Sequence, residues 1–198
     1  MKYILAILFF LIILLFNFRL IVFNADFYES ISEDNSNFDK ERVVNLINYL
    51  KNKEQLNTEN YTEKEILHLK DVKILINKIL MFFYILLMTF IFLLVRYYKE
   101  FPNILVLSSL ITISVVIILF LLNFSNLFYR FHLISFNNYL WLLDPETTLI
   151  KLFPEIFFKS FFAIVLFRSF IVSLFFLFIG LVVQFKHTFG KIKKIFIY

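Results

Sequence analysis

Two histidines are the residues of this chain best suited to acid–base chemistry. His68 and His132 each lie near the end of a long apolar stretch, and the third histidine, His187, follows the last such stretch. An imidazole gains and loses a proton near neutral pH, so it can act as a general base or a general acid. Asp71 follows His68 by three residues, which on a helix puts its carboxylate on the same face and close enough to orient the ring. A single histidine is more often merely exposed or capped, so the functional interpretation depends on two of them lying together.

The composition excludes several other kinds of chemistry. The chain has no cysteine, which excludes disulfides, thiolate catalysis and Cys-ligated metals. A metal site needs about three protein ligands. His68, His132 and Asp71 would make such a set, but no His-Glu-x-x-His motif is present, and we expect no metal. With only two glycines, the chain has no glycine-rich phosphate loop, so we expect no nucleotide and no other cofactor.

Arg168 is a further candidate because it lies several residues inside an apolar stretch. A charge at such a depth is costly and marks a functional site by default. The alternatives are that its side chain reaches the surface, or that it pairs structurally with an acid such as Asp144 or Glu155. These interpretations stay open at this point.

The apolar content predicts an all-α polytopic membrane protein. Of the 198 residues, 61% are hydrophobic and 30 are Phe, whereas soluble domains are about 45–50% apolar. A helix needs about 20 apolar residues to cross the hydrocarbon, and four stretches qualify, namely residues 3–23, 76–95, 104–122 and 161–185. The first could be a signal peptide, but its length and its poor cleavage site favour a retained anchor. We expect one membrane domain over residues 1–198.

Charged residues near the spans predict the orientation of the chain. The net charge is +5. Lys and Arg gather at the N-terminus, after residue 95 and in the tail 186–198, so these parts should be cytoplasmic. This location favours a lipid bilayer over nucleic acid as the partner. Residues 24–75 hold 11 of the 15 acidic residues and should face outside together with residues 123–160. Both termini are then cytoplasmic, and His68 and His132 lie near the outer lipid surface.

The first outer segment, 24–75, is expected to contain two helix starts. Asp39 can cap a helix that carries apolar residues on one face at the spacing of an amphipathic helix. These residues are Val43, Leu46, Ile47 and Leu50. Thr62 and Glu65 form a capping box, and no helix-breaking residue follows before Arg96. The second helix should therefore run from Thr62 straight into the span 76–95.

The second outer segment, 123–160, is rich in aromatic residues, including Trp141. Such residues are typical of the interface between water and lipid. Asp144 and Phe153 each precede a proline, which predicts a helix start at both places. Together the outer segments should form a small helical subdomain outside the membrane.

Two motifs in these outer segments resemble those of a known family. The run FHLISFNNYLWLLDP at 131–145, followed by LI at 149–150 and FPEIFF at 153–158, is similar to the signature region of the lipoprotein intramolecular transacylases (Lit). The run EILHLKDVK at 65–73 resembles the second motif of that family. Four spans with both ends inside is also the layout of that family.

The resemblance implies an activity and a set of site residues. The family moves the sn-2 acyl chain of a diacylglyceryl-modified lipoprotein cysteine to the α-amino group of the same cysteine, without a cofactor, in the bacterial cytoplasmic membrane. His68 and His132 would be the two catalytic histidines, one as general base and the other as acid or oxyanion stabiliser. Residues expected to bind or position the substrate are Asp71, Trp141, Asp144 and Arg168. Thr148 stands where an acidic residue is common in the family, which casts doubt on a role for that position.

Two other functions stay open from the sequence alone. A membrane hydrolase acting on lipoprotein or lipid esters could use the same histidines, with water in place of the amine as nucleophile. A non-catalytic membrane accessory protein would use the outer segments to dock another protein and would not need either histidine.

Overall fold

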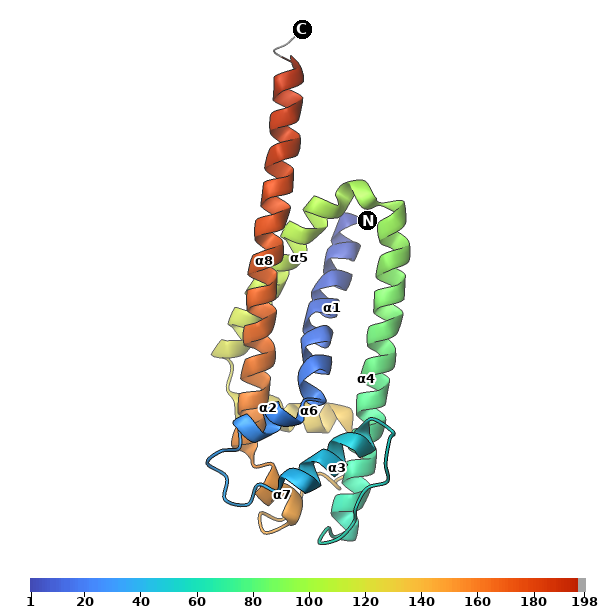
Figure 1. Ribbon diagram of the computed structural model, residues 1–198, viewed down its shortest axis with the longest axis vertical. Helices are drawn as coiled ribbons and strands as arrows, with labels where there is room; N and C mark the ends of the chain where they lie inside the picture. The colour runs from blue at the N-terminus through green and yellow to red at the C-terminus, as the bar shows by residue number, and fades with distance from the viewer. Residues whose placement is uncertain (196–198) are drawn as a thin grey trace. The chain divides into compact units, whose positions relative to one another are not determined.

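Residues 1–195 are described by the computed structural model, and every regular element among them is a helix (Figure 1). In chain order the helices are α1 (Lys2–Val22), α2 (Ala25–Ser30), α3 (Lys40–Leu50), α4 (Glu63–Arg96), the short 3-10 helix η1 (Tyr98–Glu100), α5 (Phe101–Leu121), α6 (Phe124–Ser135), α7 (Thr148–Leu152) and α8 (Glu155–Ile195). Helices α1, α4, α5 with η1, and α8 are long and apolar enough to cross a membrane. The predicted all-α, four-span class is therefore confirmed. Residues 196–198 of the predicted basic tail and the side chain of His187 lie outside the described part of the chain.

Local capping explains where two of the helices begin. The Asp39 side chain accepts a hydrogen bond from the backbone N–H of Arg42 at 3.1 Å and starts α3. At the start of α4, the Thr62 N–H donates to Glu65 Oε2 at 2.6 Å, and the Glu65 N–H donates to Thr62 Oγ1 at 3.3 Å. This is the predicted capping box. From it α4 runs without interruption to Arg96, as the sequence predicted.

The chain forms two compact units, which we describe separately. Unit 1 comprises Met1–Asn17, Phe82–Leu121 and the chain from Leu166 onward, and unit 2 comprises Phe18–Met81 and Leu122–Val165. His68 and His132 both belong to unit 2, whereas Arg168 belongs to unit 1. The single domain and the exact span boundaries expected from the sequence stay predictions.

Unit 1 holds mainly apolar helix segments, two of which approach closely. A Cβ added to Gly180 of α8 would lie 2.8 Å from Val106 Cγ2 of α5, so the close contact depends on the missing side chain. Nearby, Gln184 donates a hydrogen bond to Asn103 Oδ1 at 2.9 Å. Small residues and polar side chains of this kind are how helices associate inside a membrane.

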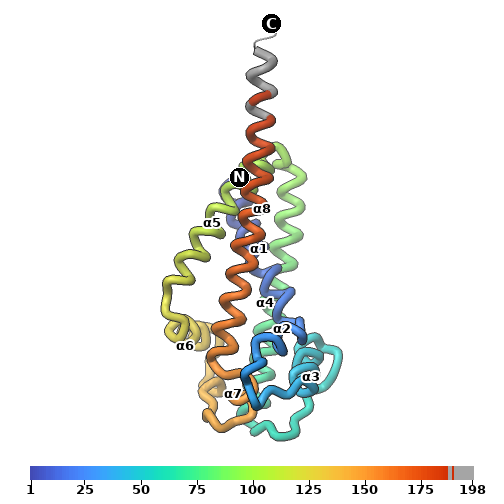
Figure 2. Tube along the Cα trace, turned by 60° about the vertical axis from the view of Figure 1, so that its left-hand side comes forward, coloured from blue at the N-terminus to red at the C-terminus, as the bar shows by residue number. Residues whose placement is uncertain are grey.

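Unit 2 packs α2, α3 and α7 against the first part of α4 and the start of α8 around one apolar core (Figure 2). The core holds the four predicted apolar residues of α3, all buried. Its other buried members are Val22, Tyr28, Tyr61, Leu69, Ile76, Leu149, Leu152, Phe153 and Phe157. Because this core includes Leu69, the neighbour of His68, it fixes the part of α4 that carries the histidine.

The segment between α5 and α8 differs from the sequence prediction in two places. Helix α6, capped by the Asn123 side chain, was not anticipated. Helix α7 begins at Thr148 and not at Asp144, so that predicted start is wrong. Asp144 instead forms a tight turn, in which its Oδ1 accepts from the Glu146 N–H at 2.8 Å and its carbonyl accepts from the Thr147 N–H at 3.0 Å. Helix α8 begins at Glu155, next to the predicted start.

Candidate active site

The two histidines predicted from the sequence lie together in unit 2. His68 is on the second turn of α4 and His132 is near the end of α6. Their ring centroids are 6.3 Å apart, and the ring planes differ by 31°. Phe136, the residue directly after α6, packs against both rings, with centroids 5.3 Å from His68 and 5.7 Å from His132. The two rings therefore lie close enough together for one reacting group to contact both.

A backbone carbonyl determines which nitrogen of His132 carries the proton. His132 Nδ1 lies 2.8 Å from the carbonyl oxygen of Phe128, one helical turn earlier on α6. A carbonyl can only accept, so Nδ1 must be the donor, and the neutral ring keeps its lone pair on Nε2. Burial lowers the pKa of His132 from the usual histidine value, and the hydrogen bond to Phe128 opposes part of this effect. At neutral pH the ring is thus an uncharged base with Nε2 free to take a proton.

In His68 the other ring nitrogen carries the proton. Its side chain is only 7% exposed, and its Nδ1 is buried with no hydrogen-bond partner among the described residues. An unpaired buried N–H is rarer in proteins than an unpaired acceptor, because a lone donor loses its only bond to water. The proton of the neutral ring therefore belongs on Nε2, which makes that nitrogen a hydrogen-bond donor. The pair thus presents one acceptor nitrogen and one donor nitrogen.

Asp71 does not make the hydrogen bond to His68 that its spacing suggested. Its Oδ2 accepts instead from the side-chain amide of Asn138, at 2.8 Å. Asn138 lies in the loop after α6, and its Oδ1 also accepts from the Leu140 N–H at 3.0 Å. The first of these bonds attaches the loop to α4, and the second holds the Asn138 side chain within its own loop. Sequence reasoning missed Asn138, although it lies inside the 131–145 motif.

Trp141 belongs to the same loop and lies against His132. The two ring centroids are 5.0 Å apart with an interplanar angle of 36°, and Tyr129 contacts the indole edge-on at 5.6 Å. The indole is half-buried. Its contact with the imidazole restricts the orientation of the His132 ring.

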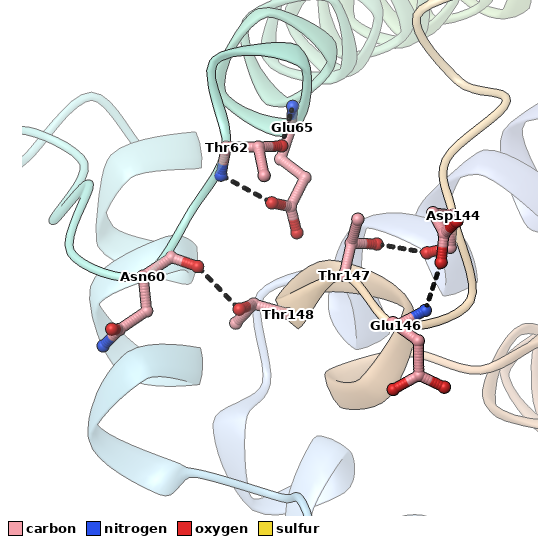
Figure 3. Close-up of a pocket in the computed structure, with 7 residues that line it drawn as sticks. All are labelled: Asn60, Thr62, Glu65, Asp144, Glu146, Thr147 and Thr148. Atoms are coloured by element: carbon pink, nitrogen blue, oxygen red, sulfur yellow. Dashed lines mark hydrogen bonds between the residues drawn. The ribbon is translucent and has the colours of Figure 1, made fainter.

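Glu65 connects the start of α4 with the start of α7, one helical turn before His68 on α4. Its side chain is fully buried, and its Oε1 accepts from the Leu149 N–H at 2.7 Å while Oε2 caps α4. Thr148 adds a bond from its hydroxyl to the Asn60 carbonyl at 2.6 Å (Figure 3). The sequence predicted the capping role of Glu65 and missed its bond to α7, which joins residues 84 apart in the chain.

A pocket of about 300 Å³ opens beside this junction (Figure 3). Its lining residues are all of polar or charged type, namely Asn60, Thr62, Glu65, Asp144, Glu146, Thr147 and Thr148. The predicted substrate residue Asp144 thus lines a pocket that also includes Glu65, a close neighbour of His68 on α4. Asp144 and Glu146 contribute carboxylates to this lining, which can accept hydrogen bonds from N–H or O–H groups of a ligand.

Two sequence-based questions remain, namely the role of Arg168 and the possibility of a metal site. Arg168 is exposed and belongs to unit 1, so its predicted role stays a prediction. Among the described residues, no group of three His, Cys, Asp or Glu side chains is placed to hold a metal ion.

Comparisons with known proteins are consistent with this site. The family model described as lipoprotein intramolecular transacylase Lit matches residues 3–158. A solved structure of the membrane integral transacylase Lit from Bacillus cereus is similar, with a TM-score of 0.76 and 22% identity, over 98% of this chain and 96% of that one. Two histidine variants of the same protein, with Arg or Ala as the new residue, match with TM-scores of 0.74 and 0.73, again at 22% identity. They cover 96% and 94% of this chain and 92% and 94% of their own. No curated protein matches the sequence.

Proposed function

This chain belongs to the Lit family of lipoprotein intramolecular transacylases, multi-pass membrane acyltransferases of lipoprotein maturation, and we propose the reaction in detail. The substrate is a diacylated bacterial lipoprotein, whose N-terminal cysteine carries a diacylglyceryl group on sulfur. The sn-2 acyl chain moves to the α-amino group of that cysteine and gives the lyso form. The observation that carries this proposal is the pair of facing imidazoles, one with an acceptor nitrogen and one with a donor nitrogen.

His132 acts as the base and then as the acid. The amine nitrogen attacks the sn-2 ester carbonyl carbon, and His132 Nε2 takes one N–H proton. The tetrahedral intermediate then breaks the bond between this carbon and the glycerol oxygen, and His132 returns the proton to that oxygen. One ester becomes one amide and one free hydroxyl. No water and no co-reactant are consumed, in line with the absence of a nucleotide motif.

His68 stabilises the negative charge that develops on the carbonyl oxygen. A buried imidazole with no carboxylate bonded to it stays neutral, so His68 donates a hydrogen bond from Nε2 without giving up its proton. Donors aimed at the developing oxyanion are usually the largest single contribution to catalysis of acyl transfer. Of the two roles left open for the second histidine, oxyanion stabilisation is the one that the buried Nδ1 supports.

Nucleophile and electrophile belong to one residue, so much of the acceleration comes from holding that residue folded back on itself. Oriented intramolecular reactions gain about 7–11 kcal/mol in this way. The α-amino group has a pKa of about 7.7–8.0, so a sizeable fraction is already neutral at physiological pH. The protein must mainly position the ester within reach of both rings and remove one proton.

The other predicted residues take binding or positioning roles. Trp141 restricts His132 and offers an aromatic surface to the glyceryl group. Asp144 lines the pocket beside Glu65 and binds peptide N–H groups that follow the cysteine. Arg168 holds negative charge of the substrate or of a lipid headgroup. Asp71 acts through Asn138 and not by touching the substrate.

We place this site at the outer leaflet of the cytoplasmic membrane, with both termini in the cytoplasm and residues 3–23, 76–95, 104–122 and 161–185 across the hydrocarbon. The absence of cysteine makes the test direct, because a single cysteine can be introduced at any position. A cysteine in place of Tyr139 should react with a membrane-impermeant maleimide in intact cells. A cysteine in place of Lys99 should react only after the cells are opened. The reverse pattern would overturn this orientation.

The proposed reaction is tested by expressing the chain in a bacterium that makes only diacylglyceryl lipoproteins. Mass spectrometry of the N-terminal lipopeptide should show an unchanged mass, with one acyl group on nitrogen. A hydrolase would instead lose the mass of one acyl chain. If the chain were a non-catalytic accessory protein, the lyso form would appear equally well with both His68 and His132 replaced by Ala. The proposal predicts that this double variant gives no lyso form.

A further inference from the structure

Asp71 and the unpartnered Nδ1 of His68 are close on α4, and yet they are not bonded. Residues three apart on a helix are neighbours, and a carboxylate is the strongest acceptor that an imidazole N–H can find. The bond that would satisfy the buried Nδ1 is nevertheless absent, and Asp71 Oδ2 accepts from Asn138 instead. A buried polar atom left without a partner needs a physical reason.

The hydrogen bonds of Asn138 explain why Asp71 does not reach His68. Its amide uses both ends, with Nδ2 donating to Asp71 and Oδ1 accepting from the Leu140 N–H. Its position is therefore held by its own loop, and the loop is held in turn by the Trp141 contact with His132. The Asp71 carboxylate is thus engaged by a side chain that is itself fixed at two points.

We propose that Asn138 is a positioning residue that holds Asp71 away from His68 and so keeps the proton of the neutral His68 ring on Nε2. If Asp71 reached Nδ1, the proton of the neutral ring would move from Nε2 to Nδ1, and Nδ1–H would donate to the carboxylate. Nε2 would then become an acceptor and could no longer donate to an oxyanion. The proposal rests on the proposed function only for its catalytic consequence, because the proton position is a property of the protein alone.

The groups that act on His68 come from two elements. His132 from α6 faces the ring, and Asp71 is the acid of its own helix that acts on it. Glu65, one turn earlier on α4, already accepts two backbone N–H groups. Of these groups, Asp71 is the one that Asn138 holds by a hydrogen bond.

The proton position is measured by 15N NMR of the full-length protein, labelled at histidine and held in detergent micelles. Imidazole 15N shifts distinguish the two neutral forms from each other and from the charged form. The His68 resonance is the one lost in His68→Gln. We expect the Nε2–H form in the unmodified protein. Asn138→Ala should convert His68 to the Nδ1–H form, and Asp71→Asn added to it should reverse this change.

Two further variants keep the proposal testable if Asn138→Ala does not fold. Asp71→Asn alone should leave His68 as the Nε2–H form, because Asp71 is not bonded to it. A change of form in this variant would overturn the proposal. The exchange variant, Asp71→Asn with Asn138→Asp, keeps an amide–carboxylate bond between the same positions while it moves the charge to the loop. It should also keep the Nε2–H form.

Activity gives the second readout. Asn138→Ala should lower kcat by about tenfold or more, since one oxyanion donor is lost, while KM stays within about twofold. The second substitution Asp71→Asn should restore most of this loss. If Asn138→Ala lowers kcat and His68 stays in the Nε2–H form, Asn138 has only a structural role and the proposal fails. If the NMR results hold and no transacylation is found, the positioning role stands and the proposed function fails.

Discussion

Glu65 and His68 lie one turn apart on α4, and both are buried, but they differ in whether their polar atoms have hydrogen-bond partners. Glu65 is completely enclosed, and each of its carboxylate oxygens accepts a backbone N–H. His68 is almost as enclosed, and its Nδ1 accepts and donates nothing among the described residues. A buried polar group with all its bonds made holds a structure together, whereas one left open is available to a ligand or a reaction.

The comparison separates two functions along a single helix. We call the first region the Glu65 junction, which consists of Glu65, Thr62, Leu149 and the Thr148–Asn60 bond. The second is the histidine pair, His68 and His132. Substitutions in the junction should lower the free energy of unfolding and leave the kcat of the folded protein nearly unchanged. Substitutions in the histidine pair should do the reverse.

The largest effect is expected at His132, because it handles the proton in both steps. General-base residues contribute about 10²–10⁴-fold, so His132→Ala should lower kcat by about 10³-fold, measured as acyl transfer on a synthetic diacylated lipopeptide. The unfolding temperature should stay near that of the parent. Tyr139→Ala is the matched control, because Tyr139 belongs to the same outer segment and is 73% exposed. A His132→Ala protein with more than a third of parental activity would contradict the assignment.

His68→Ala should follow closely, with a loss of about 10²–10³-fold in kcat, the usual cost of one oxyanion donor. Replacement by Gln distinguishes the two histidines. A glutamine amide can still donate a hydrogen bond, so His68→Gln should recover part of the loss. It cannot act as a base near neutral pH, so His132→Gln should be as inactive as His132→Ala. Equal behaviour of the two Gln variants would remove the distinction between donor and base.

The junction should respond through stability. Glu65→Ala removes the acceptor of the buried Leu149 N–H and of the partly buried Thr62 N–H. A buried donor left without an acceptor costs about 1–3 kcal/mol, so the free energy of unfolding should fall by about 3 kcal/mol in detergent. Glu65→Gln keeps one acceptor oxygen and should cost less. Glu63→Ala is the control, because Glu63 is in the same first turn of α4 but is exposed. If Glu65→Ala unfolds like the parent and instead loses kcat, Glu65 belongs to the reaction and the comparison is wrong.

The pH dependence sharpens the picture of His132. Its neutral form is the active one, and burial lowers its pKa, so protonation should remove activity only below the usual histidine value of about 6.5. The substrate amine, with a pKa of about 7.7–8.0, must also be neutral. A logarithmic plot of kcat/KM should therefore rise with slope one toward pH 8 and with slope two below the pKa of His132. In His132→Gln the steeper part should disappear, and its persistence would assign it to another group.

Helix starts set by neighbouring residues could be predicted from the sequence. Asp39 caps α3, and Thr62 with Glu65 caps α4, because each cap needs only residues within one turn of the chain. The proximity of His68 and His132 followed from the topology and the family resemblance together. Local patterns thus predicted the helix starts near His68, and two family motifs predicted the pairing of the histidines.

Contacts between distant segments explain the rest. Helix α7 begins at Thr148 because the acceptor for its second N–H comes from Glu65, far earlier in the chain, and no pattern near Asp144 reveals this. In the same way, the spacing of Asp71 from His68 suggested a bond that Asn138, 67 residues away, replaces. Spacing shows which partners are possible, and the fold decides which of them is used.

The smallest effect tests the edge of the junction. Thr148→Val removes the hydroxyl that bonds the Asn60 carbonyl but keeps the shape of the side chain, and one such bond contributes about 1 kcal/mol. Thr148→Ser keeps the hydroxyl and should lose less. Because Glu65 still caps α7 in both variants, kcat should change by less than about threefold. If Thr148→Val instead lowers kcat strongly while its unfolding resembles that of the parent, the pocket beside Thr148 takes part in catalysis, and the junction cannot be treated as structure alone.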